Sequence, residues 1–461
     1  MKKITINPVT RIEGHAKISV FVDDRNRVEN VFFQATEFRG YEKILLGLPM
    51  EEVPRIVSTI CGICRGIHFV AALKAVDRVF NAEVSEAAEK IREMLIYSHF
   101  IEDHTITLFA LGLPDYISPK ERDVFGVVKK LGTTAKDIIR KRSYALKIME
   151  ILGGKSLHPV AAIPGGWSKR LSEEERERIE RYSKELVELG EILVSIVEKE
   201  AEKMDKLELN LNFLATSKKG EYNLYDGERV VIDPDGKIVE KFSGEDYEEF
   251  IGEKSVEWSY SKLPYLKKLG WKGLQEDKSF YVTGPLARLN VSKIPTSLAR
   301  EKAERLFEFG KPCKNVIFNH WARAIEVLLC AEKLEELAGD KTVTGSVRGE
   351  VKKIGGEGVG VVEAPRGLLI HHYKTDGRGV VKWVNLIVAT TQNTPAINIA
   401  LKKAARKISK GRFSEKTLEA FERVVRAFDP CMSCATHSVS GKIPIEVEIW
   451  REGKLIRKVR N

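Results

Sequence analysis

The sequence has few cysteines and no long apolar segment. Six cysteines in 461 residues are too few for a disulfide scaffold. No run of about 18 uncharged apolar residues occurs, and the N-terminus begins Met1-Lys2-Lys3 without the apolar stretch of a signal peptide. These absences predict a cytoplasmic protein with no membrane span.

Glutamine is also scarce, and we find no internal repeat or low-complexity linker. Three glutamines stand against 76 Lys/Arg and 66 Asp/Glu, a bias associated with thermophilic proteins. The formal net charge is +10, but the densest basic cluster, residues 402–412, contains no aromatic residue for stacking on bases. Its helical spacing therefore favours a solvated helix face over a nucleic-acid surface.

Helical periodicity dominates the patterns that are present. Residues 51–210 are mostly of helical type, most clearly where Ser172 and Glu175 predict a capping box. The apolar positions that follow recur every three or four residues and are Ile179, Tyr182, Leu186, Leu189, Leu193 and Ile196. Further helices are expected over residues 296–338, 396–408 and 415–428.

Strand patterns occupy three other parts of the chain. Residues 16–22 and 28–33 alternate around a polar turn and predict an N-terminal β-hairpin. Short strands with Asp-Gly turns over residues 215–290 predict a smaller α+β lobe. Residues 443–450 and 454–459 predict a terminal hairpin that turns at Glu452-Gly453. We therefore expect an α+β fold with a large helical-bundle core.

Four cysteines form two Cys-x-x-Cys pairs, Cys61/Cys64 and Cys431/Cys434, near opposite ends of the chain. Each pair places two thiolates on one side of a tight turn, and two such turns can bind a soft or borderline metal. Zinc knuckles usually close within a few tens of residues, unlike this pairing. Spacing alone leaves structural zinc, a catalytic metal centre and a dithiol or iron-sulfur site open. Cys313 and Cys330 are lone residues in helical patterns, which we interpret as buried small hydrophobes.

The residues around the two cysteine pairs help to distinguish between these kinds of site. Both pairs are followed by a histidine, His68 and His437. Together with five other segments, they resemble the nickel-iron hydrogenase large (catalytic) subunit family. The seven ordered segments are residues 10–15 (TRIEGH), 39–42 (RGYE), 60–68 (ICGICRGIH), 113–115 (LPD), 363–367 (EAPRG), 390–393 (TTQN) and 429–437 (DPCMSCATH). Thr59 departs from the family, which usually has arginine two residues before the first cysteine.

The resemblance implies a nickel-iron centre whose iron carries carbon monoxide and cyanide. Cys61 and Cys431 would be terminal nickel ligands, and Cys64 and Cys434 would bridge nickel to iron. Thiolates suit this role because they are soft donors. The implied reaction is the reversible heterolytic cleavage of dihydrogen to protons and electrons.

Proton transfer needs a base beside the metals, and the resemblance gives that role to Glu13, which would receive the proton from a cysteine sulfur such as that of Cys431. The alternative for Glu13 is a surface ion pair with Arg11. Arg366 would lie over the metals near a cyanide, with Asp115 and Asp429 as its expected carboxylate partners. A purely structural ion pair is the alternative for Arg366.

Three further residues are expected to surround the ligands. Thr390 matches the position whose hydroxyl donates to a cyanide, and Pro365 precedes the arginine. His68 would donate toward a bridging sulfur and tune it. Without the motif, His68 is typical of a hydrogen-bonded core histidine.

Glu42 and His437 match ligands of a separate site, usually magnesium, with a backbone carbonyl near Leu386. Magnesium prefers oxygen ligands, so a histidine ligand is unusual.

In most of the family the mature chain ends at the histidine after the last cysteine. We therefore expect a catalytic domain over residues 1–437 and a precursor extension over 438–461. A maturation endopeptidase would cut between His437 and Ser438 after nickel insertion; the alternative is a permanent terminal strand pair.

The remaining cysteines cannot ligate an iron-sulfur chain, so an iron-sulfur small subunit is required as electron acceptor. The forms of the motifs at residues 37–42 and 113–115 resemble the cytosolic multi-subunit group, non-deazaflavin-reducing or sulfhydrogenase-like. Partners in that group can include flavin or further iron-sulfur subunits. Two other classes stay open: a quinone-reductase-type homologue, which lacks the nickel cysteines, and a zinc-stabilised binding protein.

Overall fold

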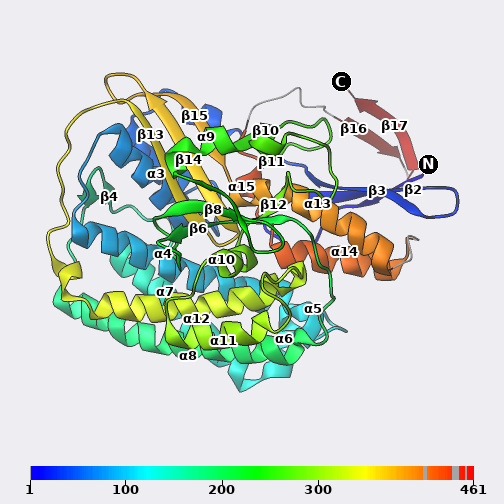
Figure 1. Ribbon diagram of the computed structural model, residues 1–461, viewed down its shortest axis with the longest axis horizontal. Coiled ribbons are helices and arrows are strands. Elements are labelled where there is room, and N and C mark those ends of the chain that lie inside the picture. The colour runs from blue at the N-terminus through cyan, green and yellow to red at the C-terminus, as the bar shows by residue number, and fades with distance from the viewer. Residues whose placement is uncertain (1, 409–412, 439–445, 452–453, 461) are drawn as a thin grey trace.

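The computed structural model describes residues 2–408, 413–438, 446–451 and 454–460. Four long helices lie side by side in the lower half of Figure 1 and form the body of the molecule. They are α4 (Glu86–Ile106), α7 (Thr133–Gly153), α8 (Glu173–Ala201) and α12 (Asn319–Gly339). The expected helical core is therefore present.

Helix α8 begins where the sequence predicts. Its N-cap Ser172 accepts from the backbone N–H of Glu175, and the carboxylate of Glu175 accepts from the backbone N–H of Ser172. This capping box satisfies two backbone donors that would otherwise lack partners. The apolar face packs on α12, where Gly190 lets the two backbones approach closely: a Cβ there would lie 2.6 Å from the Cα of Leu328.

The shorter helices connect the long ones and cover the sheets. They are α1 (Tyr41–Ile44), α2 (Val53–Val57), α3 (Arg65–Val79), α5 (Pro114–Ile117), α6 (Val124–Leu131), α9 (Tyr247–Phe250), α10 (Pro285–Val291), α11 (Ser297–Phe307), α13 (Ala389–Ile408), α14 (Glu415–Phe428) and α15 (Met432–Ala435). A π-helix, η2 (Thr107–Gly112), continues α4; the 3₁₀ turns are η1 (Met50–Glu52), η3 (Gly244–Asp246), η4 (Lys267–Leu269), η5 (Val316–Phe318) and η6 (Lys341–Thr344).

Two expected helices differ in extent from the structure. The helix predicted over residues 296–338 is two helices, α11 and α12, because Gly310 and Pro312 interrupt the pattern. Cys313 therefore lies in the connection and not in a helix, although it is buried as expected. Helix α13 starts seven residues before the predicted residue 396. It ends at Ile408, so part of the basic cluster at 402–412 lies outside the described residues.

The predicted N-terminal hairpin is confirmed as β2 (Ala16–Val22) and β3 (Val28–Ala35), and β1 (Lys2–Ile6) adds a third antiparallel strand. Short strands also occur where the smaller lobe is expected. They are β6 (Asn212–Lys218), β7 (Glu221–Tyr222), β8 (Glu228–Ile232), β9 (Ile238–Phe242) and β12 (Tyr281–Val282) in one sheet, and β10 (Ile251–Lys254) with β11 (Leu263–Leu266) in another. Strands β4 (Ala162–Ile163) and β5 (Gly166–Trp167) form a minimal pair.

An antiparallel sheet of β13 (Glu357–Ala364), β14 (Gly367–Thr375) and β15 (Val381–Ile387) was not predicted. It lies against α3, at the upper left of Figure 1. Gly360 allows this close packing, since a Cβ there would lie 1.9 Å from the carbonyl oxygen of Ala71 in α3. The sheet and the helix therefore hold their facing residues at fixed positions.

The predicted terminal hairpin is confirmed as β16 (Glu446–Arg451) and β17 (Lys454–Arg460), which pair antiparallel. Its turn at residues 452–453 and the start of the predicted strand at 443–445 lie outside the described residues.

Candidate metal centre

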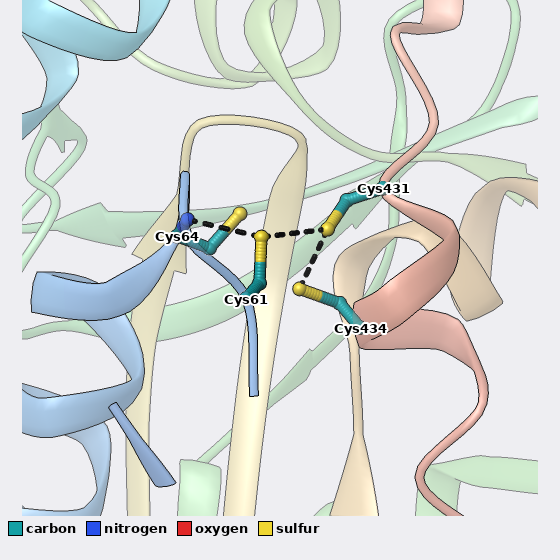
Figure 2. A group of neighbouring side chains, drawn as sticks. All are labelled: Cys61, Cys64, Cys431 and Cys434. Atoms are coloured by element: carbon teal, nitrogen blue, oxygen red, sulfur yellow. Dashed lines mark hydrogen bonds between the residues drawn. The ribbon is translucent and has the colours of Figure 1, made fainter. Parts of the chain in front are cut away.

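The two cysteine pairs meet in the interior of the protein. Cys61 precedes α3, and Cys64 is its N-cap, whereas Cys431 is the N-cap of α15 and Cys434 lies within it. All four sulfur atoms lie within 4.8 Å of one another, and none forms a disulfide (Figure 2). The sulfur of Cys431 lies 2.7 Å from that of Cys434 and 3.2 Å from that of Cys61.

The local backbone holds the first pair in a compact turn. The sulfur of Cys61 accepts from the backbone N–H groups of Ile63, over 3.2 Å, and Cys64, over 3.4 Å. Hydrogen bonds from Cys431 and the neighbouring thiols lower the pKa of Cys61 well below its usual value. Burial raises the pKa of Cys431 and of Cys434 well above that value.

This donor set fits a soft metal centre. Four thiolates in such a small volume repel one another, so a bound cation is needed to deprotonate all four. Soft sulfur ligands suit nickel and iron, although they also suit zinc. Among the described residues this is the only group of three or more potential metal ligands whose donor atoms converge.

Glu13 lies beside the second cysteine pair. The thiol of Cys431 donates to Oε2 of Glu13 over 3.0 Å, and the same oxygen accepts from the backbone N–H of Ser433 over 3.0 Å. The backbone N–H of Met432 donates to the carbonyl of Glu13. Glu13 and Cys431 thereby form an isolated parallel β-bridge. Within the described chain no ion pair links Glu13 to Arg11, which binds Asp115 instead, so the salt-bridge alternative is wrong.

Arg366 is buried beside the cysteines and forms ion pairs with two aspartates. Its Nη1 donates to Oδ2 of Asp103 over 2.9 Å and to the sulfur of Cys64 over 3.3 Å. Its Nη2 lies 2.8 Å from Oδ2 of Asp429, and its Nε donates to the carbonyl of Asp429 over 2.6 Å. Burial opposes the charge, but the two aspartates and nearby sulfur atoms raise the pKa of Arg366 well above its usual value.

The prediction that Asp115 pairs with Arg366 is wrong. Asp115 instead binds Arg426, over 2.8 and 3.0 Å, and also pairs with Arg11 and Arg122. Burial opposes its ionisation, but Arg426 and Arg11 lower the pKa of Asp115 below its usual value. Asp115 thus joins α5 to α14, and its place beside Arg366 is taken by a residue in α4.

That residue, Asp103, was missed by the sequence analysis. Asp103 has no exposed surface, and burial raises its pKa to about 7 despite the opposing charge of Arg366. The available signal was the polar trio Glu102-Asp103-His104 within an apolar stretch of helix. A buried carboxylate there requires a cationic partner, but the sequence does not reveal which one.

A cavity lined by buried residues lies against the cysteines. Ala364, Leu369 and Val388 supply apolar walls, and the polar side chains that line it besides the cysteines are Arg366, Thr390 and His68. The hydroxyl oxygen of Thr390 accepts from the backbone N–H of Cys431 over 2.9 Å, which leaves the hydroxyl proton to donate elsewhere. The cavity therefore combines apolar walls with side chains that can donate hydrogen bonds beside the cysteines.

His68 also lines this cavity and contacts the second pair. Its Nε2 is 3.4 Å from the sulfur of Cys434, and its Nδ1 is 3.0 Å from Nε2 of His371. Burial lowers the pKa of His68 to about 4, so its ring is neutral at neutral pH. The carbonyl of Pro365 is held by Nη2 of Arg288, over 3.0 Å, rather than by the cysteines.

The three residues of the expected magnesium site also lie together. Nδ1 of His437 is 3.1 Å from Oε1 of Glu42, which accepts from the backbone N–H of Leu386 over 3.0 Å. Burial opposes ionisation, but the His437 hydrogen bond helps lower the pKa of Glu42 below its usual value. Nε2 of His437 is buried with no hydrogen-bond partner among the described residues, as fits a ligand atom.

The expected cleavage site lies next to this group. His437 and Ser438 are both buried, and the carbonyl of His437 accepts from the backbone N–H of Glu42 over 3.2 Å. Cleavage between His437 and Ser438 stays a prediction.

Thr59, at the position where the family usually has arginine, is exposed, and its carbonyl accepts from the hydroxyl of Tyr41 over 3.0 Å.

Two protein-family models match the sequence of this chain. Residues 39–143 and 246–437 match the model for nickel-dependent hydrogenases, and residues 3–38 match a HoxL-like model. The chain therefore belongs to the nickel-dependent hydrogenase family, of which it is a large, catalytic subunit.

Three curated relatives illustrate the relationship. An F420-non-reducing hydrogenase iron-sulfur subunit of Archaeoglobus profundus is 47% identical, with both chains covered completely. The corresponding F420-non-reducing hydrogenase chain of Methanothermobacter marburgensis is 38% identical, also over both complete chains. The beta chain of the NAD-reducing hydrogenase HoxS of Cupriavidus necator is 35% identical over 99% of each chain.

Solved structures agree with this assignment. An NAD⁺-reducing [NiFe]-hydrogenase in its H2-reduced state matches with a TM-score of 0.88 and 34% identity, covering 95% of this chain and all of the other. The [NiFeSe] hydrogenase of Desulfovibrio vulgaris Hildenborough, at 22% identity and a TM-score of 0.75, shares the fold over 95% of this chain and all of its own.

These findings confirm the predicted family and large-subunit fold, with its mixed helices and small antiparallel sheets. The quinone-reductase and zinc-binding alternatives are wrong, since the matching family is that of nickel-dependent hydrogenases and all four cysteines converge. Within the described parts of the chain, no helix is long and apolar enough to cross a membrane.

Proposed function

We propose that this chain catalyses the reversible heterolytic cleavage of dihydrogen to protons and electrons. The observation that carries the proposal is the contact between Glu13 and Cys431 at the edge of the four-cysteine cluster. A carboxylate at hydrogen-bonding distance from a ligand sulfur can take a proton away from the centre. A site that only holds a structural metal has no need of such a group.

Cys61 and Cys431 would be terminal ligands of nickel, and Cys64 and Cys434 would bridge nickel to an iron with carbon monoxide and cyanide ligands. When bound, this centre would supply the binding of dihydrogen and the redox change. The protein would hold the diatomic groups through the donors of Arg366 and Thr390 and through the apolar cavity walls. The aspartates that pair with Arg366 keep its guanidinium in place over the centre.

Glu42 and His437, with Leu386 beside them, would hold magnesium near the C-terminal side of the centre. The unpartnered Nε2 of His437 supports a ligand role for that residue. Glu42 and His437 lie far apart in the chain, so a cation there would tie the segment after Cys434 to the segment after β3. Such a link would stabilise the second cysteine pair.

Electrons would leave through an iron-sulfur small subunit. Cys313 and Cys330 are the cysteines outside the cluster, and burial raises the pKa of Cys313 to about 11 and that of Cys330 well above its usual value. Two separate buried thiols cannot ligate an iron-sulfur cluster. The names of the relatives, which include iron-sulfur and NAD-reducing hydrogenase subunits, support a multi-subunit complex with further flavin or iron-sulfur partners.

Maturation would remove residues 438–461 by an endopeptidase after nickel-insertion proteins have acted, and the enzyme would work in the cytoplasm. The family match ends at His437, which supports this position as the mature terminus.

Metal analysis and infrared spectroscopy of the co-expressed complex test the proposal. We expect nickel and iron near a 1:1 ratio, with carbon monoxide and cyanide stretching bands. Zinc alone, without these bands, would contradict it. A complex with normal bands but no hydrogen uptake or evolution would contradict the assigned reaction.

A further inference from the structure

A chain of three buried side chains leads from the second cysteine pair into the sheet of β13, β14 and β15. His68 in α3 approaches Cys434 with Nε2 and His371 with Nδ1. The other ring nitrogen of His371, Nδ1, lies 2.6 Å from the hydroxyl of Tyr373. His371 and Tyr373 are two residues apart in β14 and so point to the same face of the strand. All three side chains are buried.

The distances restrict where the protons lie. Two ring nitrogens 3.0 Å apart can form a hydrogen bond only if one proton lies between them, so His68 and His371 cannot both present N–H there. Each neutral ring has one N–H and one lone pair, so fixing one end of the chain fixes the other. Protons can therefore be donated all in one direction, from Tyr373 toward Cys434, or all in the reverse direction.

The reverse direction is unfavourable at both ends. It would leave the hydroxyl proton of Tyr373 without an acceptor, because His371 is the only hydrogen-bond partner of that hydroxyl in the described chain. It would also require Cys434 to keep a proton for donation to His68, whereas a metal-bound cysteine is a thiolate. Donation from Tyr373 toward the sulfur satisfies every group.

We infer that Tyr373 and His371 are positioning residues that set the tautomer of His68, so that its Nε2–H donates to the sulfur of Cys434. This inference rests on the proposed nickel-iron centre, in which Cys434 is a bridging ligand. An N–H directed at a thiolate withdraws electron density from the sulfur and weakens its donation to the metals. Each preceding hydrogen bond in the chain polarises the next and strengthens that effect.

Substitutions along the chain test the inference through the infrared bands of the co-expressed complex. In Tyr373→Phe, which removes a single oxygen, the C–O stretch should move to lower wavenumber, because the sulfur becomes a stronger donor to iron. His371→Met removes the N–H that faces His68, and should shift the band further in the same direction. His371→Gln restores an N–H donor at that place, and should return the band toward its wild-type position.

A second tyrosine–histidine pair, formed by Tyr247 in α9 and His372 in β14, offers a matched control. Tyr247 donates to, or accepts from, Nδ1 of His372 over 2.9 Å, on the opposite face of β14 and without contact to His68. Tyr247→Phe should therefore leave the bands unchanged. A general disturbance of the sheet would shift the bands in this variant too and would overturn the inference.

The outcomes separate this inference from the proposed function. Wild-type enzyme without nickel, iron or the diatomic bands would overturn the proposed function. Normal wild-type bands that stay at the same wavenumber in Tyr373→Phe and His371→Met, at full metal content, would overturn this inference alone. Equal shifts in His371→Gln and His371→Met would also overturn it. If His371→Met loses its metals, the position of the C–O band in the conservative variant Tyr373→Phe is the test of this inference.

Discussion

Oε2 of Glu13 lies 3.0 Å from the sulfur of Cys431, although 418 positions separate the two residues in the chain. The contact does not depend on the side chains alone. Backbone pairing between the segment after β1 and the segment before α15 holds both residues in register. The carboxylate of Glu13 is thus held against the four-cysteine cluster by the same backbone pairing that brings these two distant segments together.

Glu13→Gln should reduce hydrogen oxidation by about 10²–10⁴-fold, the usual contribution of a positioned acid-base group. Glutamine keeps the size and can still accept from Ser433, but it cannot take up a proton. Nickel and iron contents should stay normal. Hydrogen uptake with an artificial electron acceptor measures the effect, and Glu37→Gln, at a half-buried carboxylate that pairs with His15, is the matched control. Full activity of Glu13→Gln would exclude the relay role.

Cys431→Ser should abolish stoichiometric nickel binding, because a serine hydroxyl is a hard and weakly acidic donor compared with a thiol. Nickel and iron are measured by elemental analysis of the purified complex. Cys330→Ala, at a buried cysteine outside the cluster, should retain both metals. Equal nickel in the two variants would contradict the assignment of Cys431 as a ligand.

Arg366→Lys should lower activity by about 10²–10³-fold, as expected for the loss of a positioned donor over a reacting centre. One ammonium group cannot reproduce the contacts of the planar guanidinium with Asp103, Asp429 and Cys64. The infrared bands should shift as well. Arg122→Lys, which changes a partly exposed arginine of the Asp115 cluster, should leave the bands unchanged. Infrared bands that move equally in Arg366→Lys and Arg122→Lys would argue against a specific role of Arg366 at the metal centre.

Glu326 in α12 should control the acid stability of the helical body. Burial opposes its charge, but Arg288 and hydrogen bonds lower the pKa of Glu326 to about 2, from an ordinary value of 4.5. Because the folded-state pKa is depressed, the ionised group stabilises the protein above about pH 4.5, and this stabilisation is lost as the pH falls toward 2. Glu326→Gln should lower the free energy of unfolding at pH 7 by about 3–5 kcal/mol.

The difference between Glu326→Gln and wild type should shrink as the pH falls from 4.5 to 3. Urea unfolding of the isolated chain at both ends of this range measures it. Glu336→Gln, at an exposed position of the same helix, should change stability by less than about 0.5 kcal/mol. A pH-independent difference for Glu326→Gln would show that its charge is not the stabilising feature.

Intact-mass measurement tests the processing of the chain. In the nickel-loaded complex the large subunit should end at His437, whereas cells grown without nickel should retain residues 438–461. The buried peptide bond after His437 must become accessible before it is cut. Full-length mass in an active, nickel-loaded enzyme would show that the hairpin of β16 and β17 is permanent.

Much of the fold could be predicted because the signals are local. The capping box of α8, the alternation of β2 and β3 and the terminal hairpin each depend on residues close together in the chain. The sheet of β13, β14 and β15 was missed because two of its strands are buried along most of their length. Such strands lack the alternation of apolar and polar residues that marks a half-exposed strand.

The sequence by itself determined the ligand set and the family: two spaced cysteine pairs within seven ordered motifs. Only the tertiary structure decided which groups meet around them. It placed Asp103 rather than Asp115 beside Arg366, and it joined His68 to His371 and Tyr373. The physical reason is that a buried charge or ring nitrogen needs a partner, while the partner's identity depends on how distant helices and strands pack.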